Sequence, residues 1–211
     1  MDFSYFKKHL TKLSNAEIGG LHAQFKLAPK IRKQYSEDFI SSKNPIKAAV
    51  LVIFYPDSKG ELNFLLTQRA SYKGTHSAQI SFPGGKLDLQ DESLKNTALR
   101  EAKEEIGIVT NDVTIFKQMT EVYIPPSNFI VTPFLSYLNY TPLFKKNYEV
   151  EALIEVALSD FLNENALTST ILSTSYANKI EVPCFKLNNY IVWGATAMML
   201  SEIKDLINKI H

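Results

Sequence analysis

Residues 82–108 read FPGGKLDLQDESLKNTALREAKEEIGI, and this stretch decides the fold. A Pro-Gly-Gly turn leads through an acidic loop into a predicted helix from Leu94 to Ile106, which Gly107 ends in the position of a left-handed C-terminal cap. One side of this helix is apolar, with Leu94, Ala98, Ala102 and Ile106. Three glutamates spaced i, i+3 and i+4 share a neighbouring side: Glu101, Glu104 and Glu105. The stretch therefore predicts an amphipathic helix with a concentrated carboxylate face.

This carboxylate face opposes helix stability. Like-charged pairs at these spacings destabilise a helix by roughly 0.2–0.5 kcal/mol each, and the macrodipole disfavours anions in the C-terminal half. Arg100 and Lys103 offset only part of the repulsion. One interpretation is an ordinary solvated helix face. The other is a site for Mg²⁺, which prefers hard oxygen ligands completed by water and substrate phosphate. The Gly-Gly turn upstream favours the second interpretation.

The helix and its approach resemble the Nudix box, G-x5-E-x7-R-E-U-x-E-E-x-G-U with U apolar. Residues 100–108, REAKEEIGI, match the second half at every position. The first half is offset by one residue. Counting back from Arg100 puts Glu92 in the acidic position and Lys86 in the Gly position, whereas counting forward from Gly85 puts Asp91 in the acidic position. The second count gives GGK-x-D-x-x-D, which resembles the coenzyme A pyrophosphatase branch of the Nudix family.

A second signature of that branch lies upstream, LLTxR-[SA]-x3-R-x3-G-x3-FPGG. The chain has LLTQRA at residues 65–70 and FPGG at residues 82–85 at the matching spacing. The resemblance implies substrate contacts for Arg69, His76 and Gln79. Two positions depart from it, because Gly74 stands where the branch has a second Arg and Ala78 where it has Gly. The missing Arg removes a cation that could hold a substrate phosphate.

The resemblance also implies the roles of the site residues. It implies a metal site of Mg²⁺ or Mn²⁺ formed by the Gly85 carbonyl with Glu101, Glu104 and Glu105. Glu104 and Glu101 are implied to be catalytic, together with a later carboxylate, for which Glu149 is the first candidate and Glu151 the second. A solvent-facing half of an amphipathic strand is the alternative interpretation of these last two. Arg100 is expected to orient a glutamate within the helix. For the adenine, Tyr123 and Phe129 are available to stack, with core packing as the alternative.

The resemblance implies an α/β fold in which a mixed β-sheet is sandwiched between helices. We expect residues 46–211 to form this Nudix hydrolase domain, with a buried strand at 48–55. A C-terminal helix opens at residues 193–197, and its apolar stripe predicts core or homodimer packing. Residues 1–45 are expected to form a helical arm, with one helix in residues 1–14 and another in residues 31–40. Pro133, inside a predicted strand, suggests an edge position or a bulge.

The composition of the chain limits the kinds of molecule that it is expected to bind. The chain has 211 residues, 45% of them hydrophobic, which suffices for one domain with a substantial core. A net charge of +1 gives no field for nucleic acid or an anionic membrane. No apolar run is long enough to cross a bilayer, and the N-terminus lacks the pattern of a signal peptide. The single Cys184 fits a reducing compartment, so we expect a cytoplasmic protein with a small-molecule substrate.

By resemblance the substrate is coenzyme A or an acyl derivative, cut at the diphosphate to give phosphopantetheine and adenosine 3′,5′-bisphosphate. Two other functions compete with this hypothesis. One is hydrolysis of another nucleoside diphosphate derivative, such as ADP-ribose or a dinucleotide, which the glycine at Gly74 keeps open. The other is a non-catalytic nucleotide sensor with the same pocket, which the intact REAKEE sequence disfavours.

Overall fold

The computed structural model describes residues 1–70, 79–174 and 177–210. Within these residues the helices are α1 (Phe3–Lys8), α2 (Leu10–Asn15), α3 (Gly20–Phe25), α4 (Glu37–Ser42), α5 (Leu94–Ile106), α6 (Leu158–Leu162) and α7 (Gly194–Ile207). The strands are β1 (Ile46–Pro56), β2 (Leu62–Arg69), β3 (Ile80–Ser81), β4 (Gly84–Lys86), β5 (Thr114–Gln118), β6 (Val122–Ile124), β7 (Phe129–Tyr137), β8 (Val150–Ala157), β9 (Leu167–Thr174), β10 (Ala177–Leu187) and β11 (Tyr190–Trp193).

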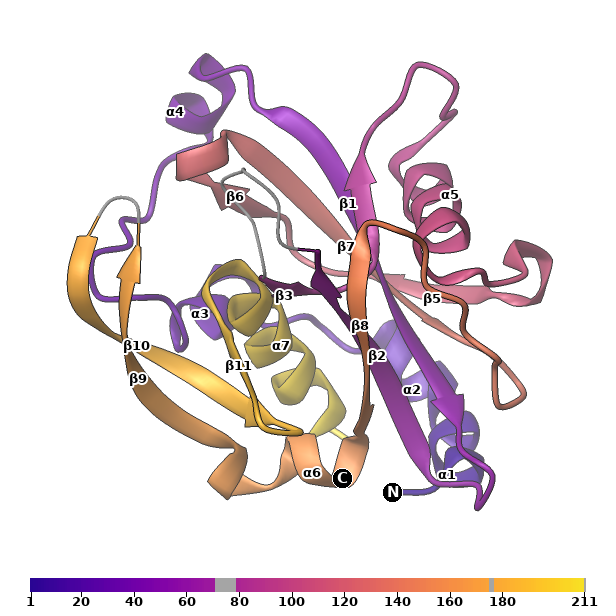
Figure 1. Ribbon diagram of the computed structural model, residues 1–211. Helices are drawn as coiled ribbons and strands as arrows, with labels where there is room; N and C mark the ends of the chain where they lie inside the picture. The colour runs from indigo at the N-terminus through magenta and orange to yellow at the C-terminus, as the bar shows by residue number, and fades with distance from the viewer. Residues whose placement is uncertain (71–78, 175–176, 211) are drawn as a thin grey trace.

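The strands form one large mixed sheet and one small antiparallel sheet (Figure 1). In the large sheet the order is β3-β2-β1-β7-β5, with β4 on β1, β6 on β7 and β8 on β2. The β1–β7 pair is parallel, and the other pairs of this sheet are antiparallel. The small sheet has the order β11-β10-β9. The predicted mixed sheet is therefore confirmed.

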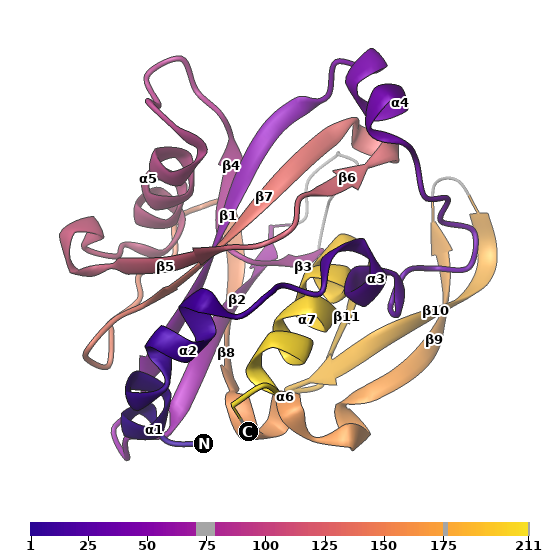
Figure 2. The same cartoon turned by 180° about the vertical axis from the view of Figure 1, so that it is seen from behind.

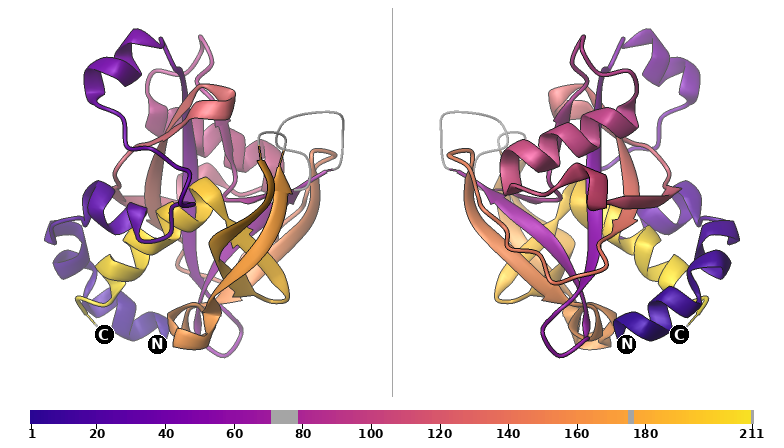
Figure 3. Two further views of the ribbon diagram at one scale, coloured as in Figure 1. Left: turned by 90° about the vertical axis from the view of Figure 1, so that its left-hand side faces the viewer. Right: turned by 90° about the vertical axis from the view of Figure 1, so that its right-hand side faces the viewer.

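Helices cover both faces of the large sheet, with α5 on one face and α7 on the other (Figure 3). Strand β1 is buried on both faces because its side chains alternate between two cores. Ala49, Leu51 and Ile53 pack in the core of α5, with Ala98, Ala102 and Ile106. Val52 and Phe54 belong to the larger core, which includes the apolar stripe of α7. This stripe is core packing, since Leu200, Ile203 and Leu206 are each 1% exposed.

Several local predictions need correction. The helix predicted in residues 1–14 is two helices, α1 and α2, that break at His9 (Figure 2). Their buried residues Phe6 and Leu13 belong to the larger core. The helix predicted at 31–40 begins six residues later, as α4, where the side chain of Ser36 caps its first turn. Pro133 does not lie at an edge, because β7 runs between β1 and β5. It is tolerated because its antiparallel neighbour changes there from β6 to β5, at a break in the pairing.

Among the described residues, no helix combines the length and the apolar character that crossing a membrane requires.

Candidate active site

The Gly-Gly turn brings the backbone of β4 against β1. Gly84 has a φ of +156°, and a Cβ atom there would lie 2.3 Å from the carbonyl oxygen of Ala49. Only glycine tolerates this approach, because real Cβ atoms do not come so close to backbone oxygens. The register Ala49 opposite Gly85 then fixes the turn beside the carboxylate face of α5.

Helix α5 has the predicted bounds because both of its ends are capped. The Ser93 hydroxyl accepts a hydrogen bond from the Asn96 N–H at 3.2 Å, and Gly107 ends the helix in the left-handed region at φ +71°. The fully buried Ala98 and Ala102 hold the helix on the sheet. The glutamate face is therefore turned toward β4, where a Cβ atom on Gly85 would lie 2.4 Å from the Glu101 carboxylate carbon.

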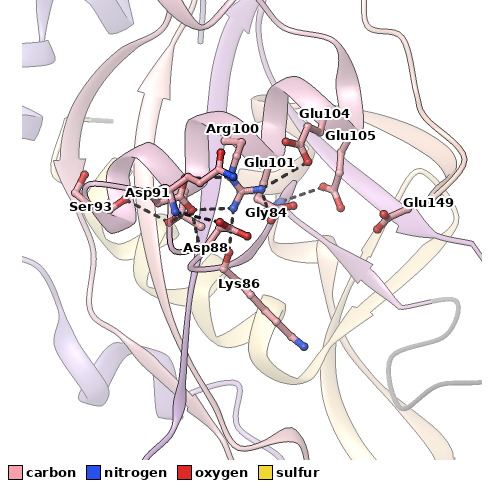
Figure 4. Close-up of polar contacts among 12 residues, drawn as sticks. Gly84, Lys86, Asp88, Asp91, Ser93, Arg100, Glu101, Glu104, Glu105 and Glu149 are labelled. Carbon is pink, nitrogen blue, oxygen red and sulfur yellow. Dashed lines mark hydrogen bonds and ion pairs between the residues drawn. The ribbon is translucent and has the colours of Figure 1, made fainter.

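Asp91 is the acid that pairs with the arginine of the motif. Its carboxylate accepts hydrogen bonds from Arg100 Nε at 3.0 Å and Nη2 at 2.8 Å, and also from the Asp88 N–H and the Thr97 hydroxyl (Figure 4). The Arg100 guanidinium is the main reason that the pKa of Asp91 lies well below its usual range. Glu92 is exposed instead. Counting the motif forward from Gly85 is thus the count that the geometry supports.

Arg100 connects this acid to the carboxylate face. Its Nη1 donates to Glu101 Oε1 at 2.8 Å and lies 3.6 Å from Glu104 Oε2, while Nη2 also donates to the Lys86 carbonyl. The paired carboxylates, Asp91 first, raise the pKa of Arg100 above its usual value. Burial raises the pKa of Glu101 above its usual value, against the opposing effect of Arg100. Arg100 therefore orients Glu101 within the helix, as expected.

Glu105 and Glu149 face each other across the cluster (Figure 4). Glu105 is 5% exposed, and within the described residues its carboxylate accepts one hydrogen bond, from the Gly84 N–H at 3.0 Å. Burial, with repulsion from Glu101 and Glu149, raises its pKa to about 7. The loop before β8 is tied to the end of α5, since the Asn147 N–H donates to the Glu105 carbonyl. This loop presents Glu149, whose carboxylate lies 3.2 Å from Arg69 Nη2.

These carboxylates line a cavity of about 990 Å³. Its lining comes from α5, from the Gly-Gly turn and β1, from residues 124–131, from the start of α7 and from residues 29–35. Trp193, the last residue of β11, forms an apolar wall with Met198 and Met199 of α7. A cavity of this volume accommodates a nucleotide-sized ligand.

Comparison with known proteins identifies the family. A family model described as the NUDIX domain matches residues 45–169. Uncharacterized Nudix hydrolases NudL from Yersinia pestis and Yersinia pseudotuberculosis are each 31% identical to this chain over 163 residues, which cover 77% of this chain and 80% of theirs.

The chain belongs to the Nudix hydrolase family. It is therefore an enzyme, a pyrophosphohydrolase. Solved structures agree on the fold: the Nudix hydrolase RenU from M. smegmatis is 15% identical and covers 88% of this chain and 95% of its own, with a TM-score of 0.55. A MutT/nudix family protein from Enterococcus faecalis is 13% identical and covers 99% of this chain and 75% of its own, with a TM-score of 0.50.

Nudix hydrolases use divalent metal ions, and the residues present here fit one. The Gly85 backbone leaves no room for a side chain beside Glu101, so its carbonyl can approach a shared ligand. Glu101 and Glu105 carry more negative charge than their few donors satisfy, which a hard cation would relieve. In the described part of the chain, no three acidic, His or Cys side chains already converge on one point. Instead, Arg100 forms ion pairs with Glu101 and Glu104, and the Gly84 N–H donates a hydrogen bond to Glu105.

The predicted substrate contacts divide into three groups. Arg69, Gln79 and Phe129 line the cavity. Tyr123 is 8% exposed and is not a lining residue; its hydroxyl donates to Asn128 and its ring packs edge-on against Tyr35. His76 lies outside the described residues, as do Gly74 and Ala78.

Of the two later acids, Glu149 lines the cavity and Glu151 is exposed outside it. Sequence reasoning missed the contribution of residues 29–35, because no local pattern relates them to the box. The one available signal was the basic run Lys30-Ile31-Arg32-Lys33.

Proposed function

We propose that this Nudix hydrolase cleaves the diphosphate of coenzyme A or an acyl-CoA in the cytoplasm, with Mg²⁺ or Mn²⁺ as the cofactor. The products are phosphopantetheine and adenosine 3′,5′-bisphosphate. The observation that carries the substrate assignment is the pairing of Asp91 with Arg100. It supports the GGK-x-D-x-x-D spacing, in which the motif acid stands one residue earlier than in the general box.

The lining of the cavity suits a substrate that has both an apolar chain and an aromatic base. Trp193, Met198 and Met199 give a wall for the pantetheine chain. Phe129 also lines the cavity and is an aromatic residue available to stack on the adenine. The diphosphate between these two parts would lie at the carboxylates of α5.

The mechanism follows from the positions of the acids. A bound divalent cation supplies charge neutralisation at the diphosphate oxygens and lowers the pKa of an attacking water. Glu101, Glu104 and Glu105, with the Gly85 carbonyl, would hold it. Glu149 lies beside these glutamates, and Arg69 Nη2 is 3.2 Å from its carboxylate, so a Glu149 oxygen would accept the proton of the water. Arg100 keeps Glu101 facing β4.

A second substrate class remains in competition, namely other nucleoside diphosphate derivatives such as ADP-ribose or a dinucleotide. The replacement of the second signature Arg by Gly74 favours it. Both substrate classes would undergo the same chemistry at the diphosphate, so the kcat/KM values for the two classes distinguish them.

The test is a substrate panel of coenzyme A, acetyl-CoA, ADP-ribose and a diadenosine polyphosphate, with Mg²⁺, Mn²⁺ or EDTA, and with products separated by chromatography. The expected result is metal-dependent release of adenosine 3′,5′-bisphosphate and phosphopantetheine, with the highest kcat/KM for coenzyme A or its acyl derivative. A higher kcat/KM for ADP-ribose or the dinucleotide would overturn the assignment in favour of the second class.

A further inference from the structure

A buried carboxylate fixes the N-terminal region to the rest of the molecule. Glu202 on α7 is fully buried. Its carboxylate accepts hydrogen bonds from the Gly20 N–H at 2.9 Å, from Gln24 Nε2 at 3.1 Å and from the Thr120 hydroxyl at 2.6 Å. Three donors around one buried carboxylate make a stable connection, because each charge-assisted bond lies away from solvent. Helix α3 is therefore held against α7 and the turn between β5 and β6.

Further contacts extend this connection along the chain. The Ser201 hydroxyl donates to the Ala23 carbonyl at 2.7 Å, and Lys26 forms an ion pair with Asp205 at 2.6 Å. Farther along, the guanidinium of Arg32 donates to the carbonyl of Tyr123 at the centre of β6. The segment between α3 and α4 is thus tied to α7 at its start and to β6 in its middle (Figure 1).

The segment held in this way forms part of the cavity wall. Its lining residues are Pro29, Ile31, Arg32, Lys33 and Tyr35. The cavity is consequently closed by a part of the chain that precedes the residues 45–169 matched by the family model. Because this wall lies outside the region matched by the family model, its residues can give this enzyme a substrate preference of its own.

Charges are distributed unevenly around the cavity. The four lining carboxylates gather on α5 and at Glu149, together with Arg69. Two lysines, Lys33 and Lys86, line other parts of the wall. The side chain of Lys86 extends away from the carboxylates (Figure 4). Its Nζ lies 5.5 Å from the centre of the Phe129 ring. Within the described part of the chain, neither lysine forms an ion pair.

We propose that Lys33, together with Lys86, binds a second anionic group of the substrate, a phosphomonoester distinct from the diphosphate that is cleaved. An ammonium group without a carboxylate partner, in a cavity that also holds a stacking aromatic ring, suits a phosphate on the nucleoside. The inference rests on the proposed function, in which this group is the 3′-phosphate of coenzyme A. Lys33 then supplies a cation in place of the second signature Arg, where this chain has Gly74.

The test compares coenzyme A with 3′-dephospho-CoA, which has the same diphosphate and lacks only the phosphomonoester. Steady-state kinetics are measured for the full chain, for Lys33→Ala and for Lys33→Arg. We expect Lys33→Ala to lower kcat/KM for coenzyme A by about tenfold, the loss of one charge-assisted contact, and to leave that for 3′-dephospho-CoA within about twofold. Lys33→Arg keeps the charge and should retain most of the preference for coenzyme A.

Lys30→Ala is the matched control, since Lys30 is an exposed lysine of the same segment that does not line this cavity. It should change neither substrate's kcat/KM. If Lys33→Ala affects both substrates equally, or neither, Lys33 does not bind the phosphomonoester and the inference is overturned while the proposed function stands. If the unaltered enzyme cleaves neither compound, the proposed function fails and the inference fails with it.

Discussion

Two helices of this protein carry buried glutamates, and the two sites differ in how the charge is satisfied. Glu202 on α7 has three hydrogen-bond donors around its carboxylate, the Gly20 N–H, Gln24 Nε2 and the Thr120 hydroxyl. Among the residues that the structure describes, Glu105 on α5 has one donor, the Gly84 N–H, and its pKa is raised by burial and by the repulsion of Glu101 and Glu149. Both side chains are at most 5% exposed, so burial alone does not distinguish them.

The difference separates a structural acid from a functional one. A buried carboxylate with a full set of donors stabilises the fold that surrounds it, whereas one left with too few donors lowers stability until a ligand supplies the missing charge. Perturbed carboxylates that gather at a cavity are accordingly typical of active sites. Substitutions that remove acids and their neighbours from each site test this contrast.

The largest expected effect is at Glu104. Glu104→Gln keeps the size of a side chain that is 56% exposed, so the fold should be retained. It removes a charge from the proposed metal site, and kcat should fall by at least about 10³-fold. The measurement is turnover of the best substrate with saturating Mg²⁺, alongside a thermal melt. Glu151→Gln, an exposed acid outside the cavity, serves as the control. A Glu104→Gln enzyme with near-normal turnover would remove this glutamate from the site.

The next effect concerns the backbone at Gly85. A methyl group there would meet the Glu101 carboxylate at 2.4 Å, so Gly85→Ala should displace that side chain and lower kcat/KM by about 10²-fold. Gly60→Ala is the matched control, because Gly60 lies in a turn with open space around it. Its positive φ predicts a stability loss of about 1 kcal/mol with unchanged kinetics. Similar kinetics for both variants would argue against a close approach at Gly85.

A stability comparison tests the contrast directly. Glu202→Leu leaves three buried donors without an acceptor, so the free energy of unfolding should fall by about 3 kcal/mol. Glu105→Gln removes a poorly satisfied charge and should leave stability unchanged or higher at pH 8 without divalent ions. Urea unfolding of both variants checks the prediction. Should Glu105→Gln be the more damaging change, the assignment of the two acids would be reversed.

The smallest expected effect is the pH dependence from Asp91. Its native pKa lies below the unfolded value of about 3.9, so the unfolded chain binds the proton more readily. The stabilisation is complete above about pH 4 and is lost as the pH falls through the lower native pKa. Asp91→Asn should cost about 1–2 kcal/mol at pH 7 and less as the pH falls below 4. Unfolding curves at several pH values measure this, with the exposed Glu92→Gln as control; an equal loss at every pH would contradict it.

Local sequence signals are most informative where a helix or a turn ends on a residue that favours positive φ. Helix α5 has the predicted bounds because Gly107 takes a conformation that few other residues adopt. The hairpin of β10 and β11 turns at Asn188 and Asn189, both with positive φ, a conformation that asparagine favours in two-residue hairpin turns. The identity of the motif acid was open in the sequence, with Asp91 and Glu92 in competition, because one residue in a loop changes the count. Only the side-chain contacts of Arg100 distinguish them.

Features that depend on distant partners were not predictable in the same way. Strand β9 was missed because its polar Ser and Thr residues show no clear alternation, and its pairing to β10 makes it a strand. Residues 29–35 line the cavity because Glu202, far along the chain, holds α3 in place. Tyr123 looked available for stacking, yet Tyr35 of the same N-terminal segment packs against it. Each of these depends on contacts between segments that no local pattern relates.

The most direct test of the central claim, that the carboxylate face of α5 binds a divalent cation against a diphosphate, is an anomalous diffraction map of crystals grown with Mn²⁺ and a non-hydrolysable substrate analogue. We predict a Mn²⁺ peak about 2.2 Å from oxygens of Glu101, Glu104 or Glu105 and from an analogue phosphate oxygen. A strong peak elsewhere, with these glutamates contacting no cation, would contradict the account.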